Sequence, residues 1–361
     1  MQFYLVNRGG NTVVLDVSRN HFASLLPHLA SHYQVVRIST PPQNVWILSS
    51  LANQHRERGS FQEFHSKVRG EPTRRVLYDL GRKIILINEA TDPWLSIFLC
   101  RMLRDLLRWE MLSAGVLFLH GGMVTVNGTG IAILGPPKSG KTSTSLALLG
   151  TARACHVAEN DLVVAHLRDK AVGLGWPRSM CIRSDTLDAF DQIFPALRQG
   201  VAEATHPYSG RHGTDGIQLF HLLPSEIAQV SHHEIKEQAK LDMIVFPRFV
   251  KEEEEAPHLE RVSNEEAISL LMDNWDFIPE RSVGASACDV FCGTQHWRTI
   301  CFNPFLVDSF RIPTLDALKP ALLALARLVP CYLLRQNLAH LGQSCALLIA
   351  ETESPRERAI R

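Results

Sequence analysis

One segment of the sequence has residue types and a spacing that could bind phosphate. The segment GPPKSGKT, residues 135–142, matches the pattern G-x-x-x-x-G-K-[ST] at every fixed position. A glycine at each end lets the backbone turn so that successive N–H groups point inward at phosphate oxygens, and the helix that follows offers the positive end of its dipole. The motif therefore predicts a phosphate-binding loop whose ligands are ATP or GTP and Mg²⁺.

The residue types within this loop predict separate roles. Lys141 adds a positive charge for the β and γ oxygens, and the Thr142 hydroxyl is placed to ligate Mg²⁺. The motif does not choose between hydrolysis and transfer to an acceptor. The residues expected to contact the nucleotide are Gly135, Pro136, Pro137, Lys138, Ser139, Gly140, Lys141, Thr142 and Ser143.

The sequence on both sides of the loop predicts the elements that hold it. Residues 115–135 read as a strand and then a hairpin through Asn127-Gly128, whose second strand feeds the loop. KTSTSLALLG begins a helix that Gly150 closes, and CHVAENDLVVAHL contains a strand or a pair of strands around Asp161. A chance match to the motif is the ordinary alternative, but a strand before and a helix after are the context that its mechanism requires.

Phosphoryl transfer also requires a carboxylate for the metal and a group that orients or deprotonates the nucleophile. Asp161, on the first apolar strand after the loop helix, is the best metal candidate, and capping of a neighbouring helix is its alternative role. His120 ends a strand expected to pair near the loop, where it could act on the acceptor or be an ordinary core histidine. The candidate catalytic residues are His120, Lys141, Asn160 and Asp161, with Thr142 and Asp161 as metal ligands.

The order of these features resembles the HPr kinase/phosphorylase family, whose P-loop catalytic domain is related to phosphoenolpyruvate carboxykinase. The resemblance rests on His120-Gly121, a hairpin, GPPKSGKT, a helix and the acidic segment ENDLVV, and it is specific over residues 115–170. It extends more loosely to about residue 340 through VFPRF and VPCYLLRQ. That part also resembles HPr-kinase-like proteins encoded beside peptide-modification genes, such as lasso peptide kinases.

In that family a histidine, the phosphate loop and two consecutive aspartates form the site. The first aspartate acts on the acceptor hydroxyl and the second helps to hold magnesium. His120 matches the histidine and Asp161 the second aspartate, whereas the first falls on Asn160, which cannot accept a proton as a carboxylate can. Glu159 would point to the opposite face of a strand, so the base could be His120, or positioning could supply most of the rate. The family's phosphorylase activity and its HPr-binding segment have no match downstream.

The length of the chain, 361 residues, predicts two domains, because domains contain roughly 150 residues each. The expected fold class is α/β. It comprises a P-loop domain of the HPr-kinase/phosphoenolpyruvate-carboxykinase type at residues 96–350, a small N-terminal α/β or α+β module of unknown role at residues 1–95, and a polar tail at residues 351–361. A helix over residues 93–113 opens or docks the second domain and turns its charged stripe to solvent.

Two further segments carry expectations about secondary structure. Residues 187–240 read as helical or irregular, and LDMIVFPRF reads as a buried strand that Pro247 stops. The histidines of the first segment lack ligand spacing on a clear helix, so they are expected to be surface or core residues.

Composition and segment lengths argue against several classes of partner, location and metal site. Lys plus Arg equals Asp plus Glu at 37 each, so bulk charge favours neither nucleic acid nor an acidic membrane surface as a partner. A secretory signal pattern and a membrane-length apolar run are missing, which predicts a cytoplasmic protein. The eight cysteines read as reduced thiols. Cys288, Cys292, His296 and Cys301 have zinc-ligand types but not the usual spacing.

These observations predict an ATP-dependent kinase that transfers a γ-phosphate to a hydroxyl-bearing acceptor, first of all Ser or Thr of a peptide or protein. One alternative is a metabolite kinase whose acceptor pocket includes GWPRSMCIR, where Arg178 and Arg183 could neutralise phosphate or be surface arginines. Another is a non-catalytic, nucleotide-gated binding module, for which Asn160 is the best argument. The family resemblance also leaves a homo-oligomer open.

Overall fold

The structure is a computed structural model in which two compact units are described, each by itself. Unit 1 comprises Met1–Gly115 and Phe277–Thr314, and unit 2 comprises Val116–Asp276 and Leu315–Arg361. The described residues are 3–8, 10–29, 32–50, 61–66, 71–87, 94–150, 153–158, 162–167, 170–176, 178–213, 215–250, 256–274 and 315–358.

Unit 1 is built on a seven-stranded sheet in the order β3-β1-β2-β4-β7-β6-β5. Its first two strands form a hairpin, in which Arg8 pairs with Asn11 and Phe3 with Asp16. Its elements are β1 (Phe3–Arg8), β2 (Asn11–Asp16), α1 (Arg19–Leu29), β3 (Gln34–Ile38), β4 (Trp46–Ser49), β5 (Gln62–Ser66), β6 (Arg74–Asp79), β7 (Ile84–Ile87) and α3 (Trp94–Ser113).

Helix α3 belongs to unit 1, where it packs against α1 and β2. The structure thus divides the chain after Gly115, about 20 residues later than the division at 95/96 drawn from the sequence. The stripe expected to face solvent is buried: Arg101, Asp105 and Arg108 are 7%, 2% and 2% exposed. Arg101 donates to both carboxylate oxygens of Glu71, at 2.8 and 2.5 Å, and this pairing allows its charge to be buried.

The described residues of unit 2 form three sheets. A six-stranded sheet has the order β11-β9-β10-β18-β20-β19, a four-stranded sheet the order β17-β13-β12-β8, and a three-stranded sheet the order β14-β16-β15. The strands are β8 (Leu117–Leu119), β9 (Gly121–Val126), β10 (Thr129–Leu134), β11 (Ala154–Ala158), β12 (Leu162–Leu167), β13 (Lys170–Leu174), β14 (Met180–Arg183), β15 (Arg211–His212), β16 (Gln218–Leu222), β17 (Gln238–Lys240), β18 (Met243–Phe249), β19 (His258–Arg261) and β20 (Cys331–Gln336).

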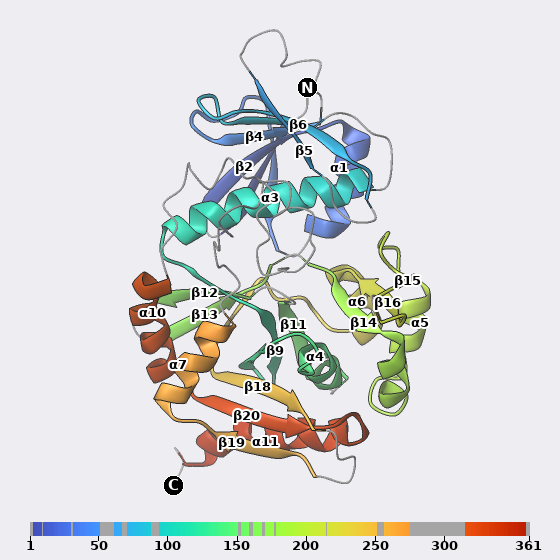
Figure 1. Ribbon diagram of the computed structural model, residues 1–361, viewed down its shortest axis with the longest axis vertical. Helices are drawn as coiled ribbons and strands as arrows, with labels where there is room; N and C mark the ends of the chain where they lie inside the picture. The colour runs from blue at the N-terminus through green and yellow to red at the C-terminus, as the bar shows by residue number, and fades with distance from the viewer. Residues whose placement is uncertain are drawn as a thin grey trace. The chain divides into compact units, whose positions relative to one another are not determined.

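The helices of unit 2 cover these sheets (Figure 1). They are α4 (Lys141–Leu149), α5 (Leu197–Ala202), α6 (Pro224–Ser231), α7 (Asn264–Asp273), α10 (Leu315–Leu328) and α11 (Leu341–Arg358), with the 3-10 helices η2 (Ser184–Phe190) and η3 (Leu338–His340). The mixed α/β character expected from the sequence is confirmed.

The centre of the six-stranded sheet is parallel. β10 pairs with β18 in the register Ile131↔Met243, and β18 pairs with β20 in the register Ile244↔Cys331. β10 also forms the expected hairpin with β9. Because the three parallel strands run the same way, their carboxyl ends lie at one edge of the sheet, the edge at which open α/β sheets bind ligands.

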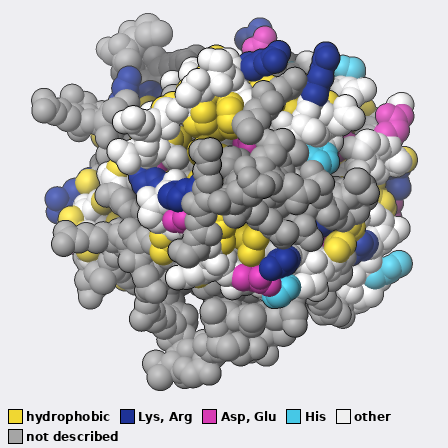
Figure 2. Space-filling view, turned by 90° about the horizontal axis from the view of Figure 1, so that it is seen from above, with side chains coloured by type: hydrophobic (Ala, Val, Ile, Leu, Met, Phe, Trp, Pro, Cys, Tyr) yellow, Lys and Arg dark blue, Asp and Glu magenta, His cyan; other side chains and the backbone are white. Residues whose placement is uncertain are grey.

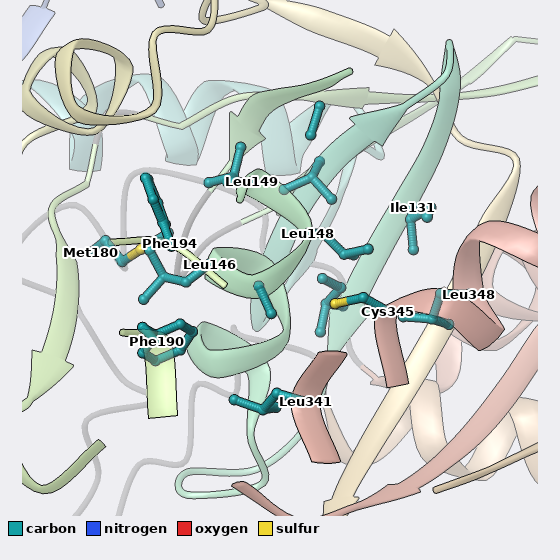
Figure 3. Packing of buried hydrophobic residues seen from close by; sticks show 14 of the residues in the cluster. Ile131, Leu146, Leu148, Leu149, Met180, Phe190, Phe194, Leu341, Cys345 and Leu348 are labelled. Carbon is teal, nitrogen blue, oxygen red and sulfur yellow. The ribbon is translucent and has the colours of Figure 1, made fainter. Parts of the chain in front are cut away.

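Helix α4 follows β10 and is buried on nearly all sides. Figure 3 shows its leucines Leu146, Leu148 and Leu149 among side chains of β10, β14, η2 and α11. Polar residues of the helix, including Thr144 and Ser145, are also buried. Such all-round burial fixes where the helix begins, because a shift of one turn would open cavities in a close-packed core.

Two expectations about secondary structure need correction. Residues 187–240 contain the strands β15, β16 and β17 as well as helices, and β16 completes a sheet with β14. Pro247 does not stop β18, which continues to Phe249. The tail at 351–361 is helical as far as Arg358, where α11 ends.

The position of Pro247 has a physical explanation. Backbone N–H groups of alternate residues in a strand point to opposite neighbours, and the N–H groups of Ile244 and Val250 point to β20. The nitrogen of Pro247 therefore faces the side of β10, whose pairing with β18 ends at Val245. A missing N–H removes no ladder bond there.

Figure 2 shows basic and acidic side chains interspersed on one face, in keeping with their equal numbers. Among the described residues, none of the helices is both long enough and apolar enough to cross a membrane.

Candidate functional site

The predicted phosphate loop connects β10 to α4, so a buried strand precedes it and a helix follows it. Two residues in the loop have left-handed backbone angles, Lys138 with φ 63° and Gly140 with φ 103°. Left-handed residues in so short a loop are the backbone pattern of an anion-binding nest. Within this loop, the N–H of Ser139 donates to Pro136 O at 3.3 Å. The N–H groups of the first turn of α4 add further donors at the same place.

Close contacts explain the glycine at each end of the loop. A Cβ on Gly135 would lie 2.6 Å from Ser139 Oγ. A Cβ on Gly140 would lie 2.7 Å from Gln336 Nε2 and 3.1 Å from the ring of Phe249. Both positions leave room only for a hydrogen, so glycine is needed where the loop packs closely against these side chains.

The side chain of Lys141 lies against the loop. It is buried, and its Nζ donates to the carbonyl oxygens of Gly135 at 2.7 Å and Pro136 at 2.8 Å. The ammonium group is thus held beside the backbone that forms the nest. A charge fixed there adds attraction for phosphate oxygens to that of the N–H groups.

A buried pair of polar side chains fixes the start of α4. Thr144 Oγ1 donates to the carbonyl of Gly140 at 2.9 Å and accepts from Gln336 Nε2 at 2.7 Å. Gln336 ends β20, the second parallel strand beyond β10, and is fully buried. Neither residue was predicted from the sequence. The signal available for Gln336 was a polar residue at the end of the strand VPCYLLRQ.

His120 lies at the base of the loop, between β8 and β9. Its carbonyl accepts from the N–H of Gly135 at 3.5 Å, and its own N–H donates to Asn274 O at 2.7 Å. The next residue, Gly121, packs so closely that a Cβ would lie 2.2 Å from Ile133 O. The backbone of His120 is therefore held next to the first glycine of the motif, as the strand order in the sequence predicts.

Several predicted residues lie outside the described part of the chain. They are Glu159, Asn160 and Asp161, and the cluster Cys288, Cys292, His296 and Cys301. Leu162, which follows Asp161 in sequence, pairs with Leu119, which precedes His120. Within the described ranges, there is no group of three or more His, Cys, Asp or Glu residues that could hold a metal ion.

Charged residues adjoin the outer side of the loop. Asp215 Oδ2 accepts from Lys138 Nζ at 3.3 Å and from Arg183 Nη1 at 2.8 Å. The Arg183 guanidinium and, next, the Lys138 ammonium hold the pKa of Asp215 well below its usual range. Asp185 also binds Arg183, at 2.7 Å. Of the two arginines singled out in the sequence, Arg183 is thus linked to the loop through Asp215.

Arg178 has a different environment. It lies near His221, and burial followed by the charge of Arg178 lowers the pKa of that histidine to about 4. His221 stacks on His206 with ring centroids 5.1 Å apart, and its Nδ1 is 3.2 Å from Ser179 Oγ. Arg178 is therefore placed with this aromatic cluster rather than with the contacts of Lys138.

Comparisons with known proteins add little to this geometry. No family model matches the chain, and no curated protein sequence matches it. Among solved structures, the chain is similar to the Hpr(Ser) kinase/phosphatase from Coxiella burnetii, with 13% identity over 40% of this chain and 76% of that chain and a TM-score of 0.24. So low a score carries no conclusion about the site, which stands on its own contacts.

Proposed function

We propose that residues 135–142 bind a nucleoside triphosphate with Mg²⁺ and that the chain is an ATP-dependent kinase. One observation carries the proposal: the motif lies between a buried strand and a helix N-terminus, with a left-handed nest and a buried lysine beside it. Anion binding follows from this geometry. Among anions, a nucleotide polyphosphate engages the backbone, the lysine and the Thr142 hydroxyl together.

The residues of the loop have distinct roles in the proposed reaction. The N–H groups and Lys141 hold the β and γ phosphates in one orientation, and positioning of this kind supplies most of the catalysis of phosphoryl transfer. Thr142 is half-buried on the first turn of α4, and Thr142 and Asp161 would hold Mg²⁺. The metal would neutralise charge on the transferred phosphate.

The acceptor is a hydroxyl group in this proposal. His120 would orient or deprotonate it, because its backbone is bonded to the first glycine of the loop. Ser or Thr of a peptide or protein is the proposed acceptor class, on the family resemblance of residues 115–170. Asn160 in place of a carboxylate makes His120 the stronger candidate for contact with the acceptor proton.

Mass spectrometry of transfer products tests the proposal. The purified chain is incubated with Mg-ATP and a mixed set of hydroxyl-bearing peptides and small metabolites, in parallel with Lys141→Ala. We expect a gain of one phosphate on a peptide, and its loss in the variant. Phosphorylation of a metabolite alone would change the acceptor class from a peptide or protein to a small molecule. ATP binding with no product from any acceptor would contradict the kinase and favour a nucleotide-gated binding module.

His120→Asn and His120→Gln provide the residue-level test of the same proposal. Both variants keep the backbone bond to Gly135, because that bond uses the carbonyl and not the ring. Loss of transfer with unchanged ATP affinity would support a role of the ring at the acceptor. Equal losses of affinity and transfer would show that His120 only supports the loop.

A further inference from the structure

An exposed carboxylate bridges the phosphate loop to an arginine on a neighbouring sheet. The same oxygen of Asp215, Oδ2, accepts from Lys138 of the loop and from Arg183 at the end of β14. Lys138 has a left-handed backbone, which is unusual for a lysine, so its side chain leaves the loop in a direction set by the nest. The bridge therefore joins a cation of the loop to a cation of the three-stranded sheet.

The hairpin between β15 and β16 holds Asp215 in place. The N–H of Gly213 donates to Ile217 O at 2.8 Å, and Gly216 has φ 80°. The second carboxylate oxygen, Oδ1, accepts from the N–H of Ile217 at 3.3 Å. Oδ1 thus bonds to the backbone of the turn, while Oδ2 bonds to Lys138 and Arg183. The turn itself therefore places a negative charge beside these two cations.

The chemistry of this arrangement matches that of a bound phosphate. A carboxylate and a phosphate present similar pairs of oxygens to guanidinium and ammonium donors, and arginine binds both. Lys138 is 70% exposed along its side chain and Arg183 28%, so an incoming anion can reach both without opening the core. Asp185 also contacts Arg183 and would keep it oriented when Asp215 is displaced.

We propose that Lys138 and Arg183 form a second anion subsite that takes the terminal phosphate of a nucleoside triphosphate, and that Asp215 is a built-in competitor for both cations. The subsite rests on the proposed function of the loop. Asp215 lowers affinity for the triphosphate but not for the diphosphate, which lacks the terminal phosphate that the loop and the subsite would both contact. The exchange of one anion for another makes no covalent change.

Calorimetric titration with the imido analogue of ATP and with ADP, both with Mg²⁺, tests the subsite. Asp215→Asn keeps the shape and the Oδ1 acceptor for Ile217 but removes the charge. We expect it to tighten binding of the ATP analogue about fivefold, the scale of an exposed ion pair, and to change ADP affinity less than twofold. Arg183→Gln should weaken the analogue by a similar factor and leave ADP nearly unchanged, and Lys138→Gln should weaken the analogue more than ADP.

A matched control separates the subsite from general electrostatics. Asp191→Asn removes the same charge from another exposed ion pair, in which Asp191 binds Arg198 at 2.7 Å. It should leave the ratio of the two affinities unchanged. An unchanged or lowered ratio in Asp215→Asn, or an equal rise with both nucleotides, would overturn the proposal. If neither nucleotide binds the wild-type chain, the proposed function itself fails, and that result is distinct from a constant ratio.

Discussion

A left-handed turn lies at each end of β10, and the two turns lead to different structures. Before the strand, Asn127 with φ 51° and Gly128 with φ 83° turn the chain from β9 into β10. After the strand, Lys138 and Gly140 lead into α4. Both turns use residues that tolerate or require positive φ, yet the second has the features of an anion site and the first does not.

The difference lies in what the N–H groups do. At the hairpin, the N–H of Asn127 donates to Arg153 O at 3.2 Å, and Thr129 pairs with Val126 across the turn. At the loop, a helix follows, and the first N–H groups of a helix have no partner within it. A tight turn therefore becomes a phosphate site when the chain continues as a helix, and a simple hairpin when it returns antiparallel.

Alanine at the two turns gives the largest expected contrast. Gly140→Ala forces a Cβ onto a left-handed residue and within 2.7 Å of Gln336 Nε2, so we expect loss of about 2–4 kcal/mol of stability and about 100-fold of ATP affinity. Gly128→Ala should cost about 1 kcal/mol and leave affinity unchanged. Urea unfolding and calorimetric titration measure the two effects. Similar ATP affinities in Gly140→Ala and Gly128→Ala would contradict the difference assigned to the two turns.

A buried histidine on the strand next to β9 predicts how stability depends on pH. His156 lies on β11, which pairs with β9, and burial lowers its pKa to about 4. In the unfolded chain this histidine has a pKa near 6.5, so between pH 6.5 and 4 the unfolded state binds more protons than the folded state. The contribution of the neutral ring to the free energy of unfolding is therefore full above pH 6.5 and is lost as the pH falls toward 4. The loss of stability should reach about 3 kcal/mol, and His156→Met should abolish this contribution to the pH dependence.

Urea unfolding at several pH values checks this prediction. His28 and His221 also have a lowered pKa, so the variant should flatten the pH profile only in part. An unaltered profile in His156→Met would mean that this ring is not neutral in the folded protein.

The smallest expected effect concerns one side-chain bond at each end of β10. Thr144→Val leaves the buried amide of Gln336 without its acceptor and should cost about 1–3 kcal/mol, whereas Thr144→Ser keeps the hydroxyl and should cost less. At the hairpin end, Asn127 donates to Glu353 at 3.3 Å in an exposed position, so Glu353→Ala should cost less than about 0.5 kcal/mol. Chemical unfolding compares them. Equal costs would contradict the role given to the buried bond.

Local features of the site could be predicted from the sequence, because neighbouring residues determine them. The glycine spacing, the apolar strand before it and the Asn127-Gly128 turn specify the loop and the hairpin that carries it. The position of His120 also followed, since a short strand and a hairpin bring its backbone back to Gly135. Each of these depends on contacts within about 20 residues of chain.

Other features depend on contacts distant in sequence and could not be predicted. Asp215 reaches Lys138 through a hairpin in a segment that showed no clear period, and Gln336 reaches Thr144 from the far strand β20. Pro247 looked like a strand terminator because the sequence does not show that the neighbouring strand β10 stops pairing with β18 at Val245, before the proline. The sequence of helix α3 predicts an apolar face but does not show which unit that face packs against, because amphipathicity does not identify the packing partner.

Direct binding of Mg-ATP is the measurement that tests the central claim. Calorimetric titration of the wild-type chain should give one saturable site, and Lys141→Ala, checked by circular dichroism to be folded, should weaken it about 100-fold because charged hydrogen bonds to phosphate are lost. Absence of saturable binding in the wild type, or equal affinity in the two proteins, would contradict the assignment of residues 135–142 as a nucleotide-binding loop.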